Sequence, residues 1–191
     1  MGLDVYLCDG ENRVEENPSE KYPEHTCNKV YLRSAYNESG TNRVLRNLIG
    51  KDLYYIFEPG NEYEIPLSPE KINSCIVRAK EVLEEIKVAP PYRVLSEWHT
   101  FGAADNTEEA MQVFKEQLAQ HKGSYSNSKG TFFLDKPIEV TGIIFGSHYG
   151  RPTTFLIFKS DISYYIQAVE IVIEFLEYAL TLNNPVIYWS S

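Results

Sequence analysis

The sequence predicts an α+β fold in a single domain over residues 1–191, with a mixed or mainly antiparallel sheet and about three to four helices. Segments with strand and helix patterns follow one another without the regular strand–helix–strand rhythm of a parallel sheet. The longest helical pattern, near the C-terminus, is apolar over much of its circumference, so this helix is expected to be largely buried. The composition, 43% hydrophobic and 24% charged in 191 residues, is typical of a globular domain.

The N-terminal third is expected to contain short strands, an acidic loop and one helix. Leu3 to Cys8 alternates like a strand, with Val5 and Leu7 on one face. Residues 9–27 are rich in glutamate and interrupted by prolines, which indicates a loop or insertion. The elements expected next are a strand at Asn28–Arg33, a polar turn at Ser34–Gly40, a helix at Thr41–Ile49 closed by Gly50, and an extended aromatic segment at Asp52–Phe57.

The middle of the chain is expected to form two helices with a strand between them. Ser68–Glu70 is a helix start, because a capping residue precedes a proline at the first helical position, and the helix ends before Pro90–Pro91. Tyr92–Trp98 alternates like a strand. Asn106 or Thr107 caps the next helix, whose apolar face carries Met111, Phe114 and Leu118.

The C-terminal third is expected to contain three strands, the longest helix and a final strand. The strands are Thr131–Leu134, Val140–Phe145 and Thr154–Phe158, and the last two resemble a hairpin. The helix covers Ser163–Leu182 and precedes a strand at Val186–Trp189. Its polar edge is expected to face solvent rather than to hold a metal, and it consists of Glu170, Glu174 and Glu177.

The charge balance limits the partners of this protein. The chain carries 18 Lys and Arg against 27 Asp and Glu, a formal net charge of −9. This argues against broad binding to nucleic acid or to an anionic membrane, which requires a positive surface. The sequence shows no signal peptide and no apolar run of about 18 residues, so a cytoplasmic location is expected. The widely spaced Cys8, Cys27 and Cys75 indicate reduced thiols, and no metal or cofactor is expected.

The strongest candidate for a ligand site lies between residues 31 and 48. A strand, a polar turn with a glycine and a helix start follow one another there, and the free N–H groups of a helix start attract anions. Guanidinium groups bind phosphate or carboxylate through paired hydrogen bonds. The residues expected to bind a phosphorylated ligand are Arg33, Ser34, Tyr36, Asn37, Gly40, Arg43 and Arg46.

Other interpretations of the polar segments stay open. The arginines can pair with carboxylates of the protein itself, such as Glu38 or Glu58. A second polar loop, Gly123–Gly130, has a similar composition and carries Tyr125 and Asn127, which are suited to stacking on a base and to hydrogen bonding. This second loop can equally be an ordinary solvated connection.

The histidines do not assign a reaction. His25, His99, His121 and His148 form no metal-binding motif. His99, at a strand end, and His148, in a turn, would form an acid–base pair only if the fold brought them together. Each histidine is expected to be exposed or hydrogen-bonded within the protein, so no catalytic residue is assigned.

Two stretches of the sequence are distinctive: the opening Met-Gly-Leu-Asp-Val-Tyr-Leu and the run from Arg33-Ser34-Ala35-Tyr36-Asn37 to Asn42-Arg43-Val44-Leu45-Arg46-Asn47-Leu48. Both resemble uncharacterised small proteins from bacteriophage and prophage genomes. The loop Gly123–Asn127 and the tail near Trp189 fit the same family, so the resemblance covers most of the chain. It transfers no activity, but it implies an accessory protein of the host cytoplasm that counters host defence by sequestering a nucleotide signal or by binding a host effector.

The function expected from these observations is non-enzymatic binding of a phosphorylated small molecule, with a nucleotide-type signal as the ligand. An acidic inhibitor or immunity-like protein that binds a basic host protein is the second hypothesis, because the net charge is −9 and residues 9–27 are acidic. A nucleotide-processing enzyme that uses His99 or His148 is the third. The apolar C-terminal helix and a sheet edge are compatible with a homo-oligomer.

Overall fold

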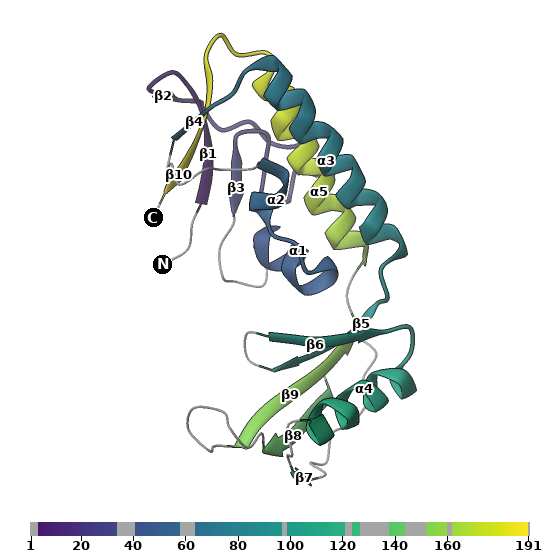
Figure 1. Cartoon of the computed structure of the whole chain (residues 1–191). Coiled ribbons are helices and arrows are strands. Elements are labelled where there is room, and N and C mark those ends of the chain that lie inside the picture. The colour runs from purple at the N-terminus through teal and green to yellow at the C-terminus, as the bar shows by residue number, and fades with distance from the viewer. Residues whose placement is uncertain are drawn as a thin grey trace. The chain divides into compact units, whose positions relative to one another are not determined.

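The computed structural model describes residues 4–33, 41–57, 64–96, 99–120, 124–126, 138–143, 152–159 and 162–190 (Figure 1). The helices are α1 (Thr41–Ile49), α2 (Leu53–Phe57), α3 (Pro69–Val88), α4 (Thr107–Gln120) and α5 (Ile162–Ala179). The strands are β1 (Asp4–Asp9), β2 (Asn12–Arg13), β3 (Tyr31–Arg33), β4 (Glu64–Pro66), β5 (Tyr92–Ser96), β6 (His99–Ala104), β7 (Ser124–Ser126), β8 (Ile138–Ile143), β9 (Pro152–Lys159) and β10 (Pro185–Ser190). The chain divides into two compact units: unit 1 is Met1–Val88 with Ile162–Ser191, and unit 2 is Ala89–Asp161.

Unit 1 contains an antiparallel sheet in the order β2–β1–β10–β4, with β3 also paired to β1. The first and last strands of the chain form its centre, from Asp4 opposite Ser190 to Asp9 opposite Pro185. Successive side chains of a strand point to opposite faces of the sheet, so alternate residues reach the core. The buried apolar residues of the three strands at the centre are Val5, Leu7, Leu32, Ile187 and Trp189.

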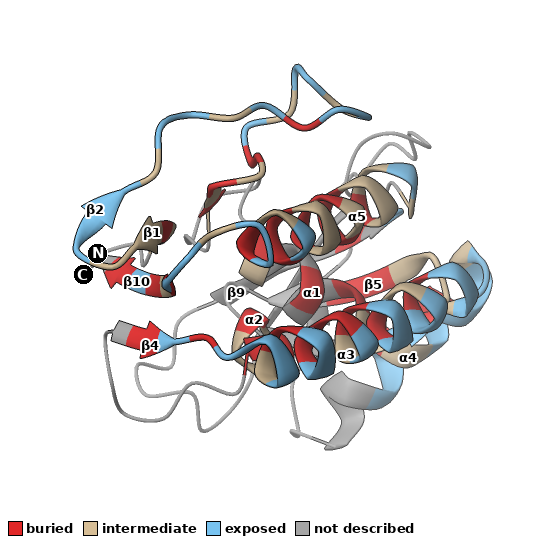
Figure 2. Ribbon diagram, turned by 90° about the horizontal axis from the view of Figure 1, so that it is seen from above, coloured by how far each residue is buried: buried red, intermediate tan, exposed pale blue. Residues whose placement is uncertain are grey.

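The core of unit 1 lies between this sheet and the helices. In α3 the buried residues lie along one side of the helix and the exposed residues along the other (Figure 2). The Phe57 ring of α2 contacts two neighbours edge to face, with centroid distances of 6.1 Å to Phe175 of α5 and 6.2 Å to Trp189 of β10. Eight of the 18 residues of α5 are buried: Tyr165, Ala168, Val169, Ile171, Val172, Phe175, Leu176 and Ala179.

The extended segment expected at residues 52–57 is wrong, because this segment forms the short helix α2. Asp52 Oδ1 accepts a hydrogen bond from the Tyr55 N–H at 3.2 Å, as an N-cap does. Asn42 Oδ1, from α1, accepts another from the Leu53 N–H at 2.8 Å. These bonds and the burial of the apolar side of α2 outweigh the strand preference of its aromatic residues.

The local signals for helix ends are confirmed. Helix α1 covers the expected residues, and Gly50 follows it with a φ of 70°, a conformation that favours glycine. Ser68 Oγ accepts a backbone N–H of α3 at 3.2 Å. Asn106 Oδ1 accepts a backbone N–H of α4 at 3.0 Å, which identifies Asn106 rather than Thr107 as the cap.

Unit 2 contains a second antiparallel sheet, in the order β6–β5–β9–β8–β7, with α4 packed on β5 and β6. The antiparallel β8–β9 ladder confirms the hairpin expected from the sequence. The strand expected at Thr131–Leu134 lies outside the described residues, and β6 was not expected. The buried core of the unit consists of Val94, Ala104, Ala110, Phe114 and Ile157.

Gly102 of β6 provides a test of this packing. A Cβ at this position would lie 2.4 Å from Val113 Cγ1 of α4. We expect Gly102→Ala to lower the free energy of unfolding by about 1–3 kcal/mol, because a β-branched side chain cannot move away without repacking. Urea denaturation followed by circular dichroism measures the loss. The double variant with Val113→Ala should recover most of it, and full stability of Gly102→Ala alone would contradict the contact.

The α+β class and the antiparallel sheets are confirmed. The described residues contain five helices, counting the short α2, and two sheets, one in each unit. No helix in the described part of the chain is long and apolar enough to cross a membrane.

Candidate functional site

The acidic segment after β2 lies along one side of α5. We call residues 14–27 the strap. The carboxylate of Glu170, on α5, accepts a hydrogen bond from the Tyr22 hydroxyl and forms an ion pair with Lys21 at 3.5 Å. The bond to this carboxylate raises the pKa of Tyr22, because ionisation would place two negative charges side by side. Glu170 therefore holds the centre of the strap on the helix.

A second contact holds the strap one turn further along α5. The Glu20 backbone N–H donates to Glu174 Oε2 at 3.2 Å, and the Glu20 side chain pairs with Lys29 at 2.5 Å. The expectation that the acidic edge of α5 faces solvent is therefore wrong for Glu170 and Glu174. It holds for Glu177, which is exposed.

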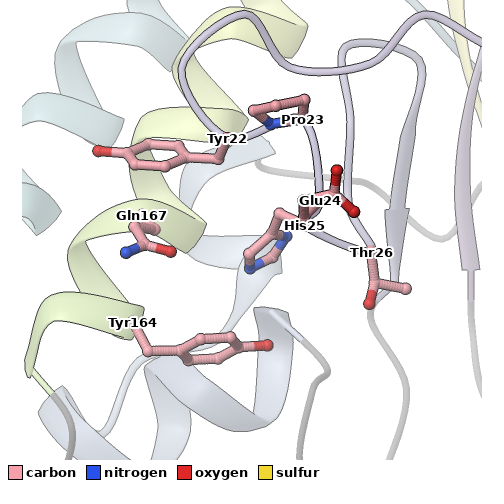
Figure 3. A pocket seen from close by; sticks show the side chains of 7 residues that line it. All are labelled: Tyr22, Pro23, Glu24, His25, Thr26, Tyr164 and Gln167. Atoms are coloured by element: carbon pink, nitrogen blue, oxygen red, sulfur yellow. The ribbon is translucent and has the colours of Figure 1, made fainter.

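An open pocket of about 490 Å³ lies between the strap and α5 in unit 1. This volume is within the range of small-molecule sites, which is about 300–1,000 Å³. The residues that line it are Tyr22, Pro23, Glu24, His25 and Thr26 from the strap, and Tyr164 and Gln167 from α5. Figure 3 shows the rings of Tyr22, His25 and Tyr164 and the amide of Gln167 around one space. A planar polar molecule would find ring faces and hydrogen-bonding groups there.

His25 is the most unusual group in the pocket. Its Nδ1 accepts a hydrogen bond from the Cys27 backbone N–H at 3.1 Å, so the proton of the neutral ring is on Nε2. Nε2 is buried and has no hydrogen-bond partner among the described residues. In Figure 3 this distal nitrogen points toward the space between Gln167 and Tyr164. The ring stacks on Tyr164 with centroids 5.2 Å apart, and burial lowers the pKa of His25, so the neutral ring is favoured.

This burial makes stability depend on pH. Burial lowers the pKa of His25 below its ordinary 6.5, so below that pH the unfolded chain takes up a proton before the folded chain does. We expect the free energy of unfolding to fall as the pH decreases from about 7.5 to about 5.5, with the full contribution present above the unfolded pKa. Urea denaturation at several pH values measures this. The decrease should be smaller in His25→Phe, and equal pH profiles in the two proteins would contradict the interpretation.

Cys27 joins the strap to the segment that the sequence predicts as a ligand site. Its Sγ lies 3.2 Å from Oγ1 of Thr41, the first residue of α1, and accepts the Arg33 backbone N–H at 3.3 Å. The thiol is fully buried, and burial raises the pKa of Cys27, so it stays protonated and does not act as a nucleophile. Cys27 is two residues from His25, a separation of at most about 7 Å along the chain. The start of α1 and the end of β3 therefore lie close to the pocket.

The structure describes the predicted anion site in part. Arg33 ends β3 and lies opposite Asp4 in the β1–β3 ladder, so a carboxylate of the protein is its neighbour on the same face. Arg43 and Arg46 lie on α1, and their side chains are outside the described residues. The remaining predicted residues of this segment, Ser34, Tyr36, Asn37 and Gly40, lie outside the described part of the chain.

The second predicted loop belongs to the other compact unit. Tyr125 lies in β7 of unit 2, and Asn127 is outside the described residues. Of the two histidines considered for catalysis, His99 starts β6 of unit 2, and His148 lies outside the described part of the chain. Within the described residues no group of His, Cys, Asp and Glu side chains could hold a metal ion.

Sequence reasoning missed the pocket. A signal was present, because Tyr164, Gln167, Glu170 and Glu174 recur at intervals of three and four along an otherwise apolar helix. Such a polar stripe faces either solvent or another polar segment of the protein. The residues that cover it belong to a segment without strand or helix periodicity, so no pattern showed that the two meet.

Comparisons of the chain with protein-family models, with curated proteins and with solved structures found no match.

Proposed function

We propose that this protein binds a phosphorylated small molecule of nucleotide type and releases it unchanged. In this proposal the ring of the ligand lies in the strap pocket and its phosphate lies toward α1 and Arg33. The observation that carries it is the position of Cys27, whose thiol contacts Thr41 and the Arg33 N–H while its own N–H holds His25 in the pocket. A ring site and a helix start that attracts anions are thus close together.

The charges around the pocket support this orientation of the ligand. Glu24 is the charged residue among those that line the pocket, and its carboxylate repels a phosphate. The start of α1 provides the positive end of a helix dipole, and the sequence adds Arg43 and Arg46 on the same helix. Thr41 itself is fully buried, so guanidinium groups rather than this residue would hold the phosphate.

The tautomer of His25 supports binding rather than catalysis. A general base needs a free lone pair, and the lone pair on Nδ1 accepts the Cys27 N–H. The other ring nitrogen, Nε2, is buried and carries the proton, so neither nitrogen is available to remove a proton from a ligand. Sequestration of a nucleotide signal, the role that the resemblance to phage proteins implies, requires no more than this.

Removal of two arginines on α1 tests the phosphate end of the site. We expect the double variant Arg43→Ala/Arg46→Ala to bind a phosphorylated ligand at least about tenfold more weakly, because it loses charge-assisted hydrogen bonds to phosphate. Titration calorimetry with a panel of nucleotides and with inorganic pyrophosphate measures the change. The double variant Lys71→Ala/Lys80→Ala on α3 is the control, since it removes the same charge elsewhere.

Two results would count against this function. One is the absence of binding heat with every nucleotide and with pyrophosphate in the unmodified protein. The other is equal affinity in the arginine variant and the lysine control. Mass spectrometry of the compound released by heating the purified protein distinguishes binding from turnover, because a sequestered ligand is recovered unchanged.

A second candidate function is binding to a basic protein. The strap, which is held on α5 at Glu20 and Tyr22, carries three further glutamates that are exposed: Glu15, Glu16 and Glu24. Exposed carboxylates on one segment favour a basic surface as the partner, and such an association weakens as salt increases. Pull-down from a host lysate at low and high salt tests it, and retention of no partner at low salt argues against it.

A further inference from the structure

We propose that a second copy of this chain binds the outer face of the unit 1 sheet and forms a twofold dimer there. The outer face is the one turned away from the helices, and its central residues are Tyr6, Cys8, Arg13, Tyr31 and Tyr188. The strap pocket lies against α5 instead, so the dimer is independent of the proposed function.

Strand register places these five side chains on one accessible face. Tyr6 and Cys8 alternate with the buried residues of β1, so they point away from the core. Tyr6 lies opposite Tyr31 of β3 and Tyr188 of β10, and Cys8 lies opposite Arg13 of β2, and residues opposite each other share a face. None of the five is buried, and Tyr188 is 41% exposed. In Figure 2 the helices of unit 1 lie on one side of β1 and β10, which leaves this face to a partner.

The outer face has the composition and the order of a protein interface. The guanidinium carbon of Arg13 lies 3.7 Å from the centre of the Tyr6 ring, and the Tyr6 and Tyr31 ring centroids are 5.1 Å apart. Burial and the neighbouring Asp4 carboxylate raise the pKa of Tyr31 to about 12, so its hydroxyl stays protonated. Side chains that are already ordered lose little freedom on association, and tyrosine and arginine are enriched among the residues that contribute most to interfaces.

Arg13 is the unbalanced charge of this face. It is exposed and stacks on Tyr6, but it forms no ion pair within the described part of the chain. At the other end of the face, Asp4 and Arg33 lie opposite each other and offset each other's charge. An exposed guanidinium that is held in place but not paired favours a partner with carboxylates.

The chain itself supplies such carboxylates beside Arg13. Glu15 and Glu16 follow it by two and three positions, are exposed, and form no ion pair with another described residue. A twofold axis near β2 therefore brings Arg13 of each copy to the glutamates of the other, and the same contact forms twice. An unrelated acidic protein would pair with the arginine but leave both glutamates unpaired, so the charges favour a second copy.

Charge reversal tests the reciprocal contact by sedimentation equilibrium of the full chain. Arg13→Glu and the double variant Glu15→Lys/Glu16→Lys should each weaken dimerisation at least about tenfold, because like charges then meet in both contacts. An equimolar mixture of the two variants should restore it to within about threefold of the unmodified protein, because each contact again joins opposite charges. Lys80→Glu is the control, since it makes the same charge reversal at an exposed position of α3.

Cys8 reports whether the outer face is the surface that becomes covered. It is partly exposed, whereas Cys27 and Cys75 are buried, so iodoacetamide should label the native chain at Cys8. In the unmodified protein this labelling should slow in proportion to the fraction of dimer as the concentration rises, and in Arg13→Glu it should stay constant. A monomer at all concentrations up to about 1 mM would overturn the proposal. So would a dimer that both variants leave intact, a mixture of folded variants that stays monomeric, or labelling of Cys8 that does not depend on concentration.

Discussion

Phe175→Ala is expected to lower the free energy of unfolding of this protein by about 3–5 kcal/mol, the usual loss for a fully buried phenylalanine. Phe175 is fully buried on α5, and its ring meets the Phe57 ring edge to face at 6.1 Å. Phe57 in turn contacts Trp189 of β10, so the cavity would open where α2, α5 and the sheet of unit 1 meet. Neighbours on three different elements cannot all move into the space, which keeps the cavity term large.

Chemical denaturation and amide exchange measure this loss. Denaturation followed by circular dichroism gives the change in free energy, and the fastest gains in amide exchange should be in α5 and β10. Leu180→Ala is the control, because this leucine is exposed just after α5 and its loss should change stability by less than about 0.5 kcal/mol. A loss below about 1 kcal/mol for Phe175→Ala would contradict the described packing.

The sequence predicts those elements whose ends carry local signals. Helix α1 begins at Thr41 and ends before Gly50, and α3 begins after Ser68, because caps and glycines act on neighbouring residues. Helix α2 has one such local signal, the Asp52 cap, but it has only five residues. It also depends on a hydrogen bond from Leu53 to Asn42 of α1 and on burial, so tertiary contacts help to override the strand preference of its residues.

The division into two compact units is also missed by local patterns. Pro90–Pro91 signals the end of α3, and the same residues mark the entry into unit 2, which returns to unit 1 before α5. A proline pair ends a helix whether the chain then stays in the same unit or enters another, so it does not reveal the second unit. The chain that completes the sheet of unit 1 comes from the other end of the sequence, where β10 pairs with β1.

The candidate site is even harder to predict from local sequence patterns. The charge and spacing of the arginines predict an anion site from adjacent residues. The pocket beside it depends on Tyr22 meeting Glu170, which is 148 positions away in the sequence. Neither residue carries a pattern that specifies the other, since a glutamate on a helix edge is usually solvated and a tyrosine in a loop has many partners. A single sequence shows which residue types could form such a site, but it does not show which distant residues come together.

Glu170→Ala is expected to release the strap from α5 and to open the pocket. The variant loses the bond from the Tyr22 hydroxyl and the ion pair with Lys21 together. The ion pair is exposed and contributes little, so most of the effect comes from the tyrosine. We expect amide exchange in residues 20–26 to accelerate at least about tenfold, which corresponds to about 1.4 kcal/mol in the opening equilibrium.

Hydrogen exchange followed by mass spectrometry of strap peptides measures this opening. Tyr22→Phe removes the hydroxyl alone and should reproduce most of the acceleration, because the ion pair with Lys21 is left in place. Glu177→Ala is the matched control: it removes the same charge from an exposed position of the same helix. Ligand affinity should fall in parallel with strap opening, since Tyr22 and His25 line the pocket only while the strap lies on α5. Unchanged exchange in Glu170→Ala would show that the other contacts of the strap, from Glu20 and His25, hold it without this carboxylate.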